Sequence, residues 1–125
     1  MHARATILVA DDEPLTRWAL KRTLEQAHLE VALASSRDAV QDLLATGEFD
    51  VVVLANELRH ECMLGVLAAL AGPPRAQGLV ILYDGDSAEE LQRVIPTAVV
   101  VQKPFGLEAV TAAVEGFLEP TREAC

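Results

Sequence analysis

The sequence contains few cysteines and few aromatic residues. Two of its 125 residues are cysteine, Cys62 and Cys125, and 4% are aromatic. Two cysteines far apart in the chain, with no CxxC spacing, indicate free thiols in a reducing compartment rather than a disulfide framework. A chain of this length buries roughly two thirds of its unfolded surface and needs no disulfide to fold. Hydrophobic residues make up 51% of the chain, so we expect a core of aliphatic side chains.

Long apolar runs and an excess of basic residues are also absent. A membrane-spanning helix needs about 20 consecutive apolar residues, and no run approaches that length. The first four residues, MHAR, lack the apolar stretch of a signal peptide. The net charge is −9, whereas nucleic-acid backbones are bound by clustered Lys and Arg. We therefore expect a soluble cytoplasmic domain that binds neither nucleic acid nor membrane.

Motifs of common catalytic sites are missing as well. The chain has no Ser-His-Asp or Cys-His arrangement, no phosphate-binding loop and no dinucleotide fingerprint. His60 and Cys62 lie near Glu57 and Glu61, but zinc requires three or four ligands at reinforced spacing. We interpret this segment as an exposed loop and predict that the protein is not an enzyme.

What the chain does have is an alternation of short apolar runs with amphipathic segments, the pattern of βα units around a parallel sheet. The predicted strands are 6–10, 31–34, 51–55, 79–83 and 98–101. The predicted helices are 14–27, 37–46, 62–71, 88–94 and 107–118. This pattern predicts an α/β fold: a flavodoxin-like, doubly wound, five-stranded parallel sheet in the order 2-1-3-4-5 with five helices. We expect one domain over residues 1–119, followed by a tail or the start of a linker at 120–125.

Chemically distinctive residues lie at the carboxyl ends of the predicted strands. In a doubly wound sheet, ligands bind at the carboxyl ends of the strands, and five positions fall there: Asp11, Asp12, Ala55, Tyr83 and Lys103. Adjacent carboxylates at a strand end suit Mg²⁺. The alternative is that Asp12 or Glu13 caps the first helix. We expect Lys103 to pair with Asp11 or Asp12, the alternative being a solvated lysine at a strand end.

Three segments in this order resemble the receiver domain of bacterial two-component response regulators: ILVADDEP at 7–14, FDVVVLA at 49–55 and VVVQKPF at 99–105. The resemblance covers residues 4–118. It implies that Ala55 stands where receivers carry the aspartate that accepts phosphate, and that Asp11 and Asp12 stand where receivers hold Mg²⁺. It also implies that Lys103 matches the lysine that contacts the phosphoryl group, before a peptide bond that is typically cis.

The same resemblance shows where this chain departs from receivers. Tyr83 stands where they have Thr or Ser, and Val101 stands where they usually have Tyr or Phe. We expect the larger Tyr83 to fill the space of the missing aspartate, the alternative being surface packing. Because a carboxylate is lost at Ala55, any Mg²⁺ binding should be weak or vestigial, and no cofactor is required. A rival alignment puts Glu57 at the acceptor position as a fixed phosphate mimic, on a lengthened third strand.

The leading hypothesis is therefore an atypical pseudo-receiver that regulates through phosphorylation-independent protein contacts. The stretch DEPLTRWALK at 12–21 looks like receivers at the N-terminus of sigma-54-dependent activators of the nitrogen-regulator type. The expected partner is another protein or the chain's own output domain, with homodimerisation as a further expectation. The alternative is a working phosphotransfer receiver with a non-standard acceptor. A flavin binder is disfavoured because three carboxylates at 11–13 would repel phosphate.

Overall fold

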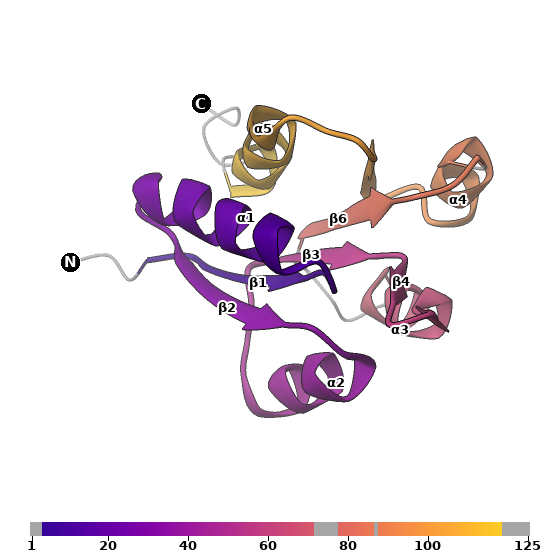
Figure 1. Ribbon diagram of the computed structural model, residues 1–125, viewed down its shortest axis with the longest axis horizontal. Coiled ribbons are helices and arrows are strands. Elements are labelled where there is room, and N and C mark those ends of the chain that lie inside the picture. Colours follow the sequence, from indigo (N-terminus) through magenta and orange to yellow (C-terminus); the bar gives the residue numbers. More distant parts are fainter. Residues whose placement is uncertain (1–3, 72–77, 87, 119–125) are drawn as a thin grey trace.

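In the computed structural model, a five-stranded parallel sheet forms the centre of the molecule (Figure 1). The structure describes residues 4–71, 78–86 and 88–118. The strands of this sheet are β1 (Thr6–Ala10), β2 (Glu30–Ala34), β3 (Val51–Ala55), β6 (Gly78–Tyr83) and β7 (Val99–Gln102). The helices are α1 (Pro14–Gln26), α2 (Arg37–Thr46), α3 (Leu64–Ala71), α4 (Ala88–Val94) and α5 (Leu107–Leu118). The strand order β2-β1-β3-β6-β7 confirms the predicted doubly wound sheet, and the tail at 120–125 lies outside the described residues.

Helices cover both faces of the sheet. Figure 1 shows α1 and α5 on one face, where they contact each other, and α2 and α3 on the opposite face, while α4 contacts β7. The central strand β3 is buried along its whole length. Such uniform burial explains why the strand sequences are continuous runs of Val, Leu and Ile, because a parallel strand covered on both faces has no solvent side.

Local signals set the helix ends much as the sequence indicates. Pro14 lies in the first turn of α1, where its missing N–H costs nothing. The Ser36 hydroxyl accepts a hydrogen bond of 3.2 Å from the backbone N–H of Ala39 and so caps α2. After α1 the chain turns through His28, whose φ of 67° lies in the left-handed region.

The segment between β3 and α3 corrects the predicted structure. Residues expected to form a loop and the first turn of a helix instead form an antiparallel hairpin of β4 (Glu57–Leu58) and β5 (Glu61–Cys62). The predicted helix over 62–71 was therefore wrong at its start, because α3 begins at Leu64. The reason is burial: Leu58 is completely buried while Glu57 and Glu61 are exposed, so the hairpin delivers one apolar side chain to the core.

The two turn residues of this hairpin have positive φ angles, which their residue types rarely adopt. Arg59 and His60 have φ values of 50° and 66°, and two-residue hairpins with positive φ at both positions usually carry Asn-Gly. We expect the double substitution Arg59→Asn/His60→Gly to raise the free energy of unfolding by about 1 kcal/mol, because Asn and Gly adopt positive φ at a lower cost than Arg and His. Urea titration followed by circular dichroism measures this. Asp38→Asn/Gln41→Gly on exposed positions of α2 is the contrasting pair and should destabilise the fold, and a neutral effect at the turn would contradict the assignment of strain.

Among the described helices, none combines the length and the apolar content that crossing a bilayer requires. The surface nevertheless carries large apolar side chains. On α1, Leu15 is 75% exposed and Trp18 is 58% exposed, and the guanidinium of Arg22 lies 5.5 Å from the centre of the Trp18 ring. On the other side of the molecule Leu64 and Val94 are exposed as well.

Candidate functional site

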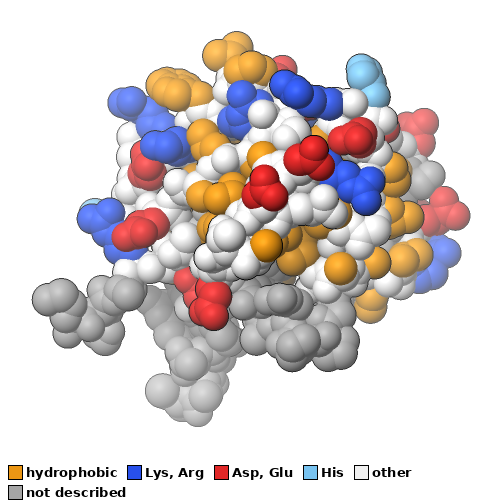
Figure 2. Space-filling view, turned by 90° about the horizontal axis from the view of Figure 1, so that it is seen from below, with side chains coloured by type: hydrophobic (Ala, Val, Ile, Leu, Met, Phe, Trp, Pro, Cys, Tyr) orange, Lys and Arg blue, Asp and Glu red, His pale blue; other side chains and the backbone are white. Residues whose placement is uncertain are grey.

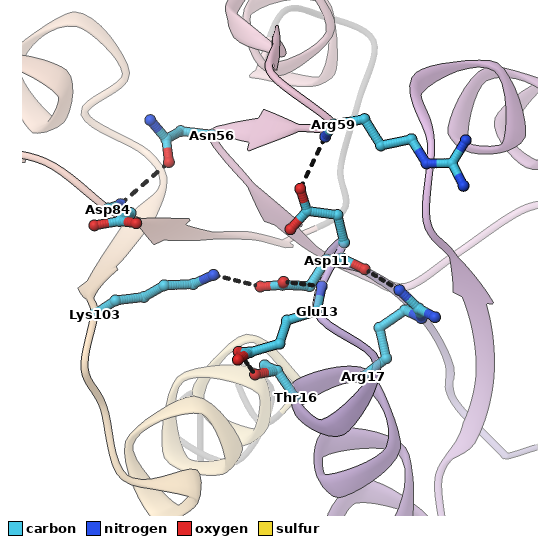
Figure 3. A network of polar contacts seen from close by, with 9 residues as sticks. Asp11, Glu13, Thr16, Arg17, Asn56, Arg59, Asp84 and Lys103 are labelled. Atoms are coloured by element: carbon cyan, nitrogen blue, oxygen red, sulfur yellow. Dashed lines mark hydrogen bonds and ion pairs between the residues drawn. The ribbon is translucent and has the colours of Figure 1, made fainter.

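An ion pair connects the segment after β1 to the segment after β7, at the carboxyl ends of the strands. Asp11 follows β1 and is completely buried, and its Oδ2 lies 2.8 Å from Nζ of Lys103, which follows β7 (Figure 3). The backbone N–H of Glu13 donates to Asp11 Oδ1 at 2.9 Å. The predicted pairing of Lys103 with one of the two aspartates is therefore observed, with Asp11 as the partner.

Neighbouring backbone contacts hold both partners of this pair. An Nη of Arg17 donates to the carbonyl of Asp11 at 2.8 Å, and the backbone N–H of Lys103 donates to the carbonyl of Tyr83 at 2.8 Å. The Lys103 side chain is 23% exposed, so water reaches only part of it. The peptide bond between Lys103 and Pro104 is cis, as the resemblance implied. Since β3 and β6 lie between β1 and β7, the lysine spans the middle of the site.

Ala55 ends β3 in the centre of this arrangement. It is 3% exposed and pairs with Leu82 of β6, while its predecessor Leu54 pairs with Ala10 of β1. By this register Ala55 is adjacent to Asp11, the position where a reactive side chain would meet both Asp11 and Lys103. A methyl group has no lone pair, so Ala55 itself offers no nucleophile for phosphorus.

Asn56, the next residue, has a connecting role that the sequence did not reveal. Its Oδ1 accepts from the backbone N–H of Asp84 at 3.1 Å, which ties the end of β3 to the loop after β6 (Figure 3). Its carbonyl accepts from the N–H of Met63 at 3.0 Å and closes the β4-β5 hairpin. No pattern in the sequence marks these bonds, since both depend on loop conformation.

Asp12 points to the hairpin rather than into the buried centre. It is exposed, and its Oδ2 accepts from the backbone N–H of Arg59 at 2.9 Å. The alternative role for Asp12 or Glu13 as a helix cap is only formally met: Glu13 occupies the N-cap position, but its side chain makes no capping bond to a backbone N–H. Instead, the Thr16 hydroxyl donates to Glu13.

The carboxylates present make a poor Mg²⁺ site. Mg²⁺ requires near-octahedral oxygen coordination, usually including carboxylates that are free to bind it. Here Asp11 is engaged by Lys103 and by a backbone N–H, and Asp12 by Arg59. Within the part of the chain that the structure describes, no cluster of three or more His, Cys, Asp or Glu side chains is placed to hold a metal. Two engaged carboxylates are therefore a weak donor set for the metal.

Tyr83 and Val101 lie at the edge of the site. The Tyr83 ring lines a hollow between α3 and α4, and a Cβ atom added at Gly85 would lie 2.9 Å from its hydroxyl oxygen. Val101 is partly buried on β7 and pairs with Leu82. The structure thus places Tyr83 on the α3–α4 side of the site, whereas Lys103 lines a separate hollow beside α1.

The rival alignment through Glu57 requires a longer third strand, and β3 ends at Ala55. Glu57 belongs to the separate β4-β5 hairpin, where it is exposed and pairs with Cys62. This alternative was therefore wrong about the strand, because the chain leaves the sheet at Asn56.

Comparison of the sequence with known proteins finds distant relatives. No protein-family model matches the chain. It is 29% identical over 128 aligned residues to ethylene receptor 4 of rice, in both the indica and the japonica subspecies, across 85% of this chain. The chain spans 16% of the length of these receptors.

Solved structures of receiver domains superpose closely. The receiver domain of Francisella response regulator 1452 matches with a TM-score of 0.82 and 21% identity, covering 94% of this chain and 99% of that one. A CheY-like receiver domain protein of Methanospirillum hungatei gives 0.84 and 15% identity, covering 98% and 100%. A receiver protein of Sinorhizobium medicae gives 0.78 and 24%, covering 94% and 96%. At these identities the likeness establishes a receiver-type fold.

Proposed function

We propose that this chain is an atypical receiver domain of two-component signalling that acts by binding another protein and does not accept phosphate. The observation that carries the proposal is Ala55, an unreactive side chain at the centre of an otherwise receiver-like arrangement of Asp11 and Lys103. The protein is then a binding module of the cytoplasm rather than an enzyme. Magnesium binds weakly and is not required for this role.

The ion pair gives this proposal a structural basis. In a phosphorylatable site Lys103 would be shared between the acceptor and its phosphoryl group, whereas here its ammonium pairs directly with buried Asp11. A buried carboxylate without a counter-charge is costly, so the lysine is retained for folding even though the acceptor is gone. This accounts for a receiver-like pair of Asp11 and Lys103 beside an unreactive Ala55.

The context we propose is a larger signalling protein. The match to rice ethylene receptors covers a small part of each receptor, which supports a modular role. The α1 sequence favours the N-terminal receiver of a sigma-54-dependent activator, with the domain at 1–119 and a linker beginning at 120. In either setting the partner is a protein surface or the protein's own output domain.

The test is intact-protein mass spectrometry after incubation with acetyl phosphate and Mg²⁺. We expect no phosphoryl adduct on the native chain, because Ala55 has no nucleophilic atom. Ala55→Asp run alongside is the matched variant, and an adduct on this variant alone would show that the rest of the pocket still supports transfer. An adduct on the native chain would contradict the proposal, and peptide mapping would then locate the non-standard acceptor.

A further inference from the structure

An apolar hollow lies between α3 and α4, on the side of the sheet away from α1. Its volume is about 350 Å³, and its lining combines one carboxylate with mainly apolar and thiol side chains: Asn56, Cys62, Leu64, Leu67, Leu91, Val94, Tyr83 and Glu90. We call it the α3–α4 hollow. Leu64 is 46% exposed and Val94 is 69% exposed, so two large aliphatic side chains meet water at its mouth. Exposed apolar groups gathered at a concave surface mark interaction sites more often than isolated ones do.

The helix on one side of this hollow is unusual in composition. The α3 sequence LGVLAALA contains no polar side chain, although Leu64, Gly65, Ala68 and Ala69 are exposed. A surface helix of a globular domain normally carries charged residues on its outer face. Figure 2 shows hydrophobic side chains at the right of the molecule, with charged side chains of both signs beside them.

The lining of the hollow includes one carboxylate, Glu90, and no Lys or Arg side chain, while the exposed Arg93 lies nearby on α4. Glu90 lines the hollow, Glu61 precedes Cys62, and Glu57 faces Cys62 across the hairpin; all three are exposed. None of these three glutamates makes an ion pair with another described residue. The ion pairs in the described part of the chain join Lys103 to Asp11 and Lys21 to Glu25. Arg59 belongs to the same hairpin, but Figure 3 shows its side chain extending away from Asn56.

From the apolar floor and the glutamates beside it we infer that the α3–α4 hollow binds a cationic amphipathic helix. One or two apolar side chains of that helix would enter between Leu64 and Val94, and its Lys or Arg side chains would meet Glu90 and Glu57, which pairs with Cys62. This is the helix-in-groove mode of recognition, with apolar anchors one helical turn apart. The inference rests on the proposed protein-binding role and specifies the chemistry of the partner.

Charge favours such a partner over a second copy of this chain. An isologous dimer through the hollow would bring the same glutamates of two copies together in molecules that each carry a net charge of −9. Long-range attraction of a cationic partner also speeds association, an effect that salt weakens.

The probe for the test is a synthetic 14-residue peptide of Leu and Lys at helical spacing, with a Leu and Glu peptide of the same pattern as its control. Binding to the full chain is followed by backbone amide chemical shifts and by calorimetry. We expect the cationic peptide to shift resonances of α3, the β4-β5 hairpin and α4, with weaker binding at higher salt. The anionic peptide should not bind.

Matched variants localise the effect. Val94→Asn should weaken binding of the cationic peptide roughly tenfold, because it removes apolar area from the contact. Leu15→Asn, at an equally exposed apolar position on α1, should leave the affinity unchanged. Glu90→Lys should weaken binding whereas Glu115→Lys on α5 should not. All four positions are exposed, so the fold tolerates these changes.

Three results would overturn the inference: no saturable binding of the cationic peptide, equal binding of both peptides, or shifts confined to α1 and α5. Self-association in sedimentation experiments that Val94→Asn abolishes would also overturn it, since a second copy would then be the occupant. None of these results bears on phosphorylation, because the mass measurement on Ala55 tests the proposed function separately.

Discussion

Replacing Lys103 with alanine is expected to destabilise the domain by about 3 kcal/mol, because it leaves the carboxylate of Asp11 buried without a counter-charge. Asp11 is completely buried, and its Oδ2 has no hydrogen-bond donor besides the ion pair with Lys103 at 2.8 Å. Removing one member of such a pair costs more than the pair contributes as a whole, since desolvation of the remaining charge is no longer offset. Chemical denaturation at neutral pH measures the change in the free energy of unfolding.

The chain contains a matched control for this prediction. Lys21 pairs with Glu25 at 2.7 Å, but both side chains are exposed, at 39% and 45%. Lys21→Ala should therefore change stability by less than about 1 kcal/mol. Adding Asp11→Asn to Lys103→Ala should restore part of the lost stability. Equal changes in the free energy of unfolding for Lys103→Ala and Lys21→Ala would contradict the prediction, since burial would then add nothing to the cost of losing the lysine.

The second large effect concerns Ala55→Asp and magnesium. The substitution places a carboxylate beside Asp11 in a position that is 3% exposed, so without metal we expect a loss of about 2–3 kcal/mol. Mg²⁺ would then find the additional ligand that the native chain lacks. At a concentration 100 times its dissociation constant, the metal stabilises the folded state by about 2.7 kcal/mol. Thermal unfolding with and without Mg²⁺ measures this difference.

Ala55→Asn separates charge from size in this experiment. Asparagine has nearly the same shape as aspartate but supplies no anionic oxygen, so its unfolding temperature should not respond to Mg²⁺. The native chain should also show no response, since Asp11 and Asp12 are already engaged by Lys103 and Arg59. A magnesium response of the native chain equal to that of Ala55→Asp would mean that the two aspartates suffice.

The sheet and the central ion pair were predictable because their signals are local. Apolar runs such as 51–55 identify buried parallel strands, and their alternation with helices fits a doubly wound sheet. Once the strands are placed, Asp11 and Lys103 meet at one edge, and opposite charges there are expected to pair. The pattern also puts Ala55 at a strand end, but that a carboxylate is missing there is what the resemblance to receiver domains implies.

The hairpin and the direction of Tyr83 were not predictable in this way. A two-residue hairpin is usually recognised by Asn-Gly, and this one has Arg59 and His60 at the turn, so no turn signal is present. Its formation depends on burial of Leu58, which is a property of the assembled core. Tyr83 is the last residue of β6, and its ring lies against residues of α3 and α4, whose packing the strand pattern does not specify.

Ala55 also determines whether such a domain can stay in a signalling state after the signal has ended. A phosphorylated aspartate retains a signal until the acyl phosphate hydrolyses, which gives a phosphorylated protein a memory with its own lifetime. A methyl group stores nothing, so the occupancy of the partner follows the momentary concentrations of the two proteins and the dissociation rate of their complex. Control over such a domain would then lie in synthesis, degradation and competition for its partner.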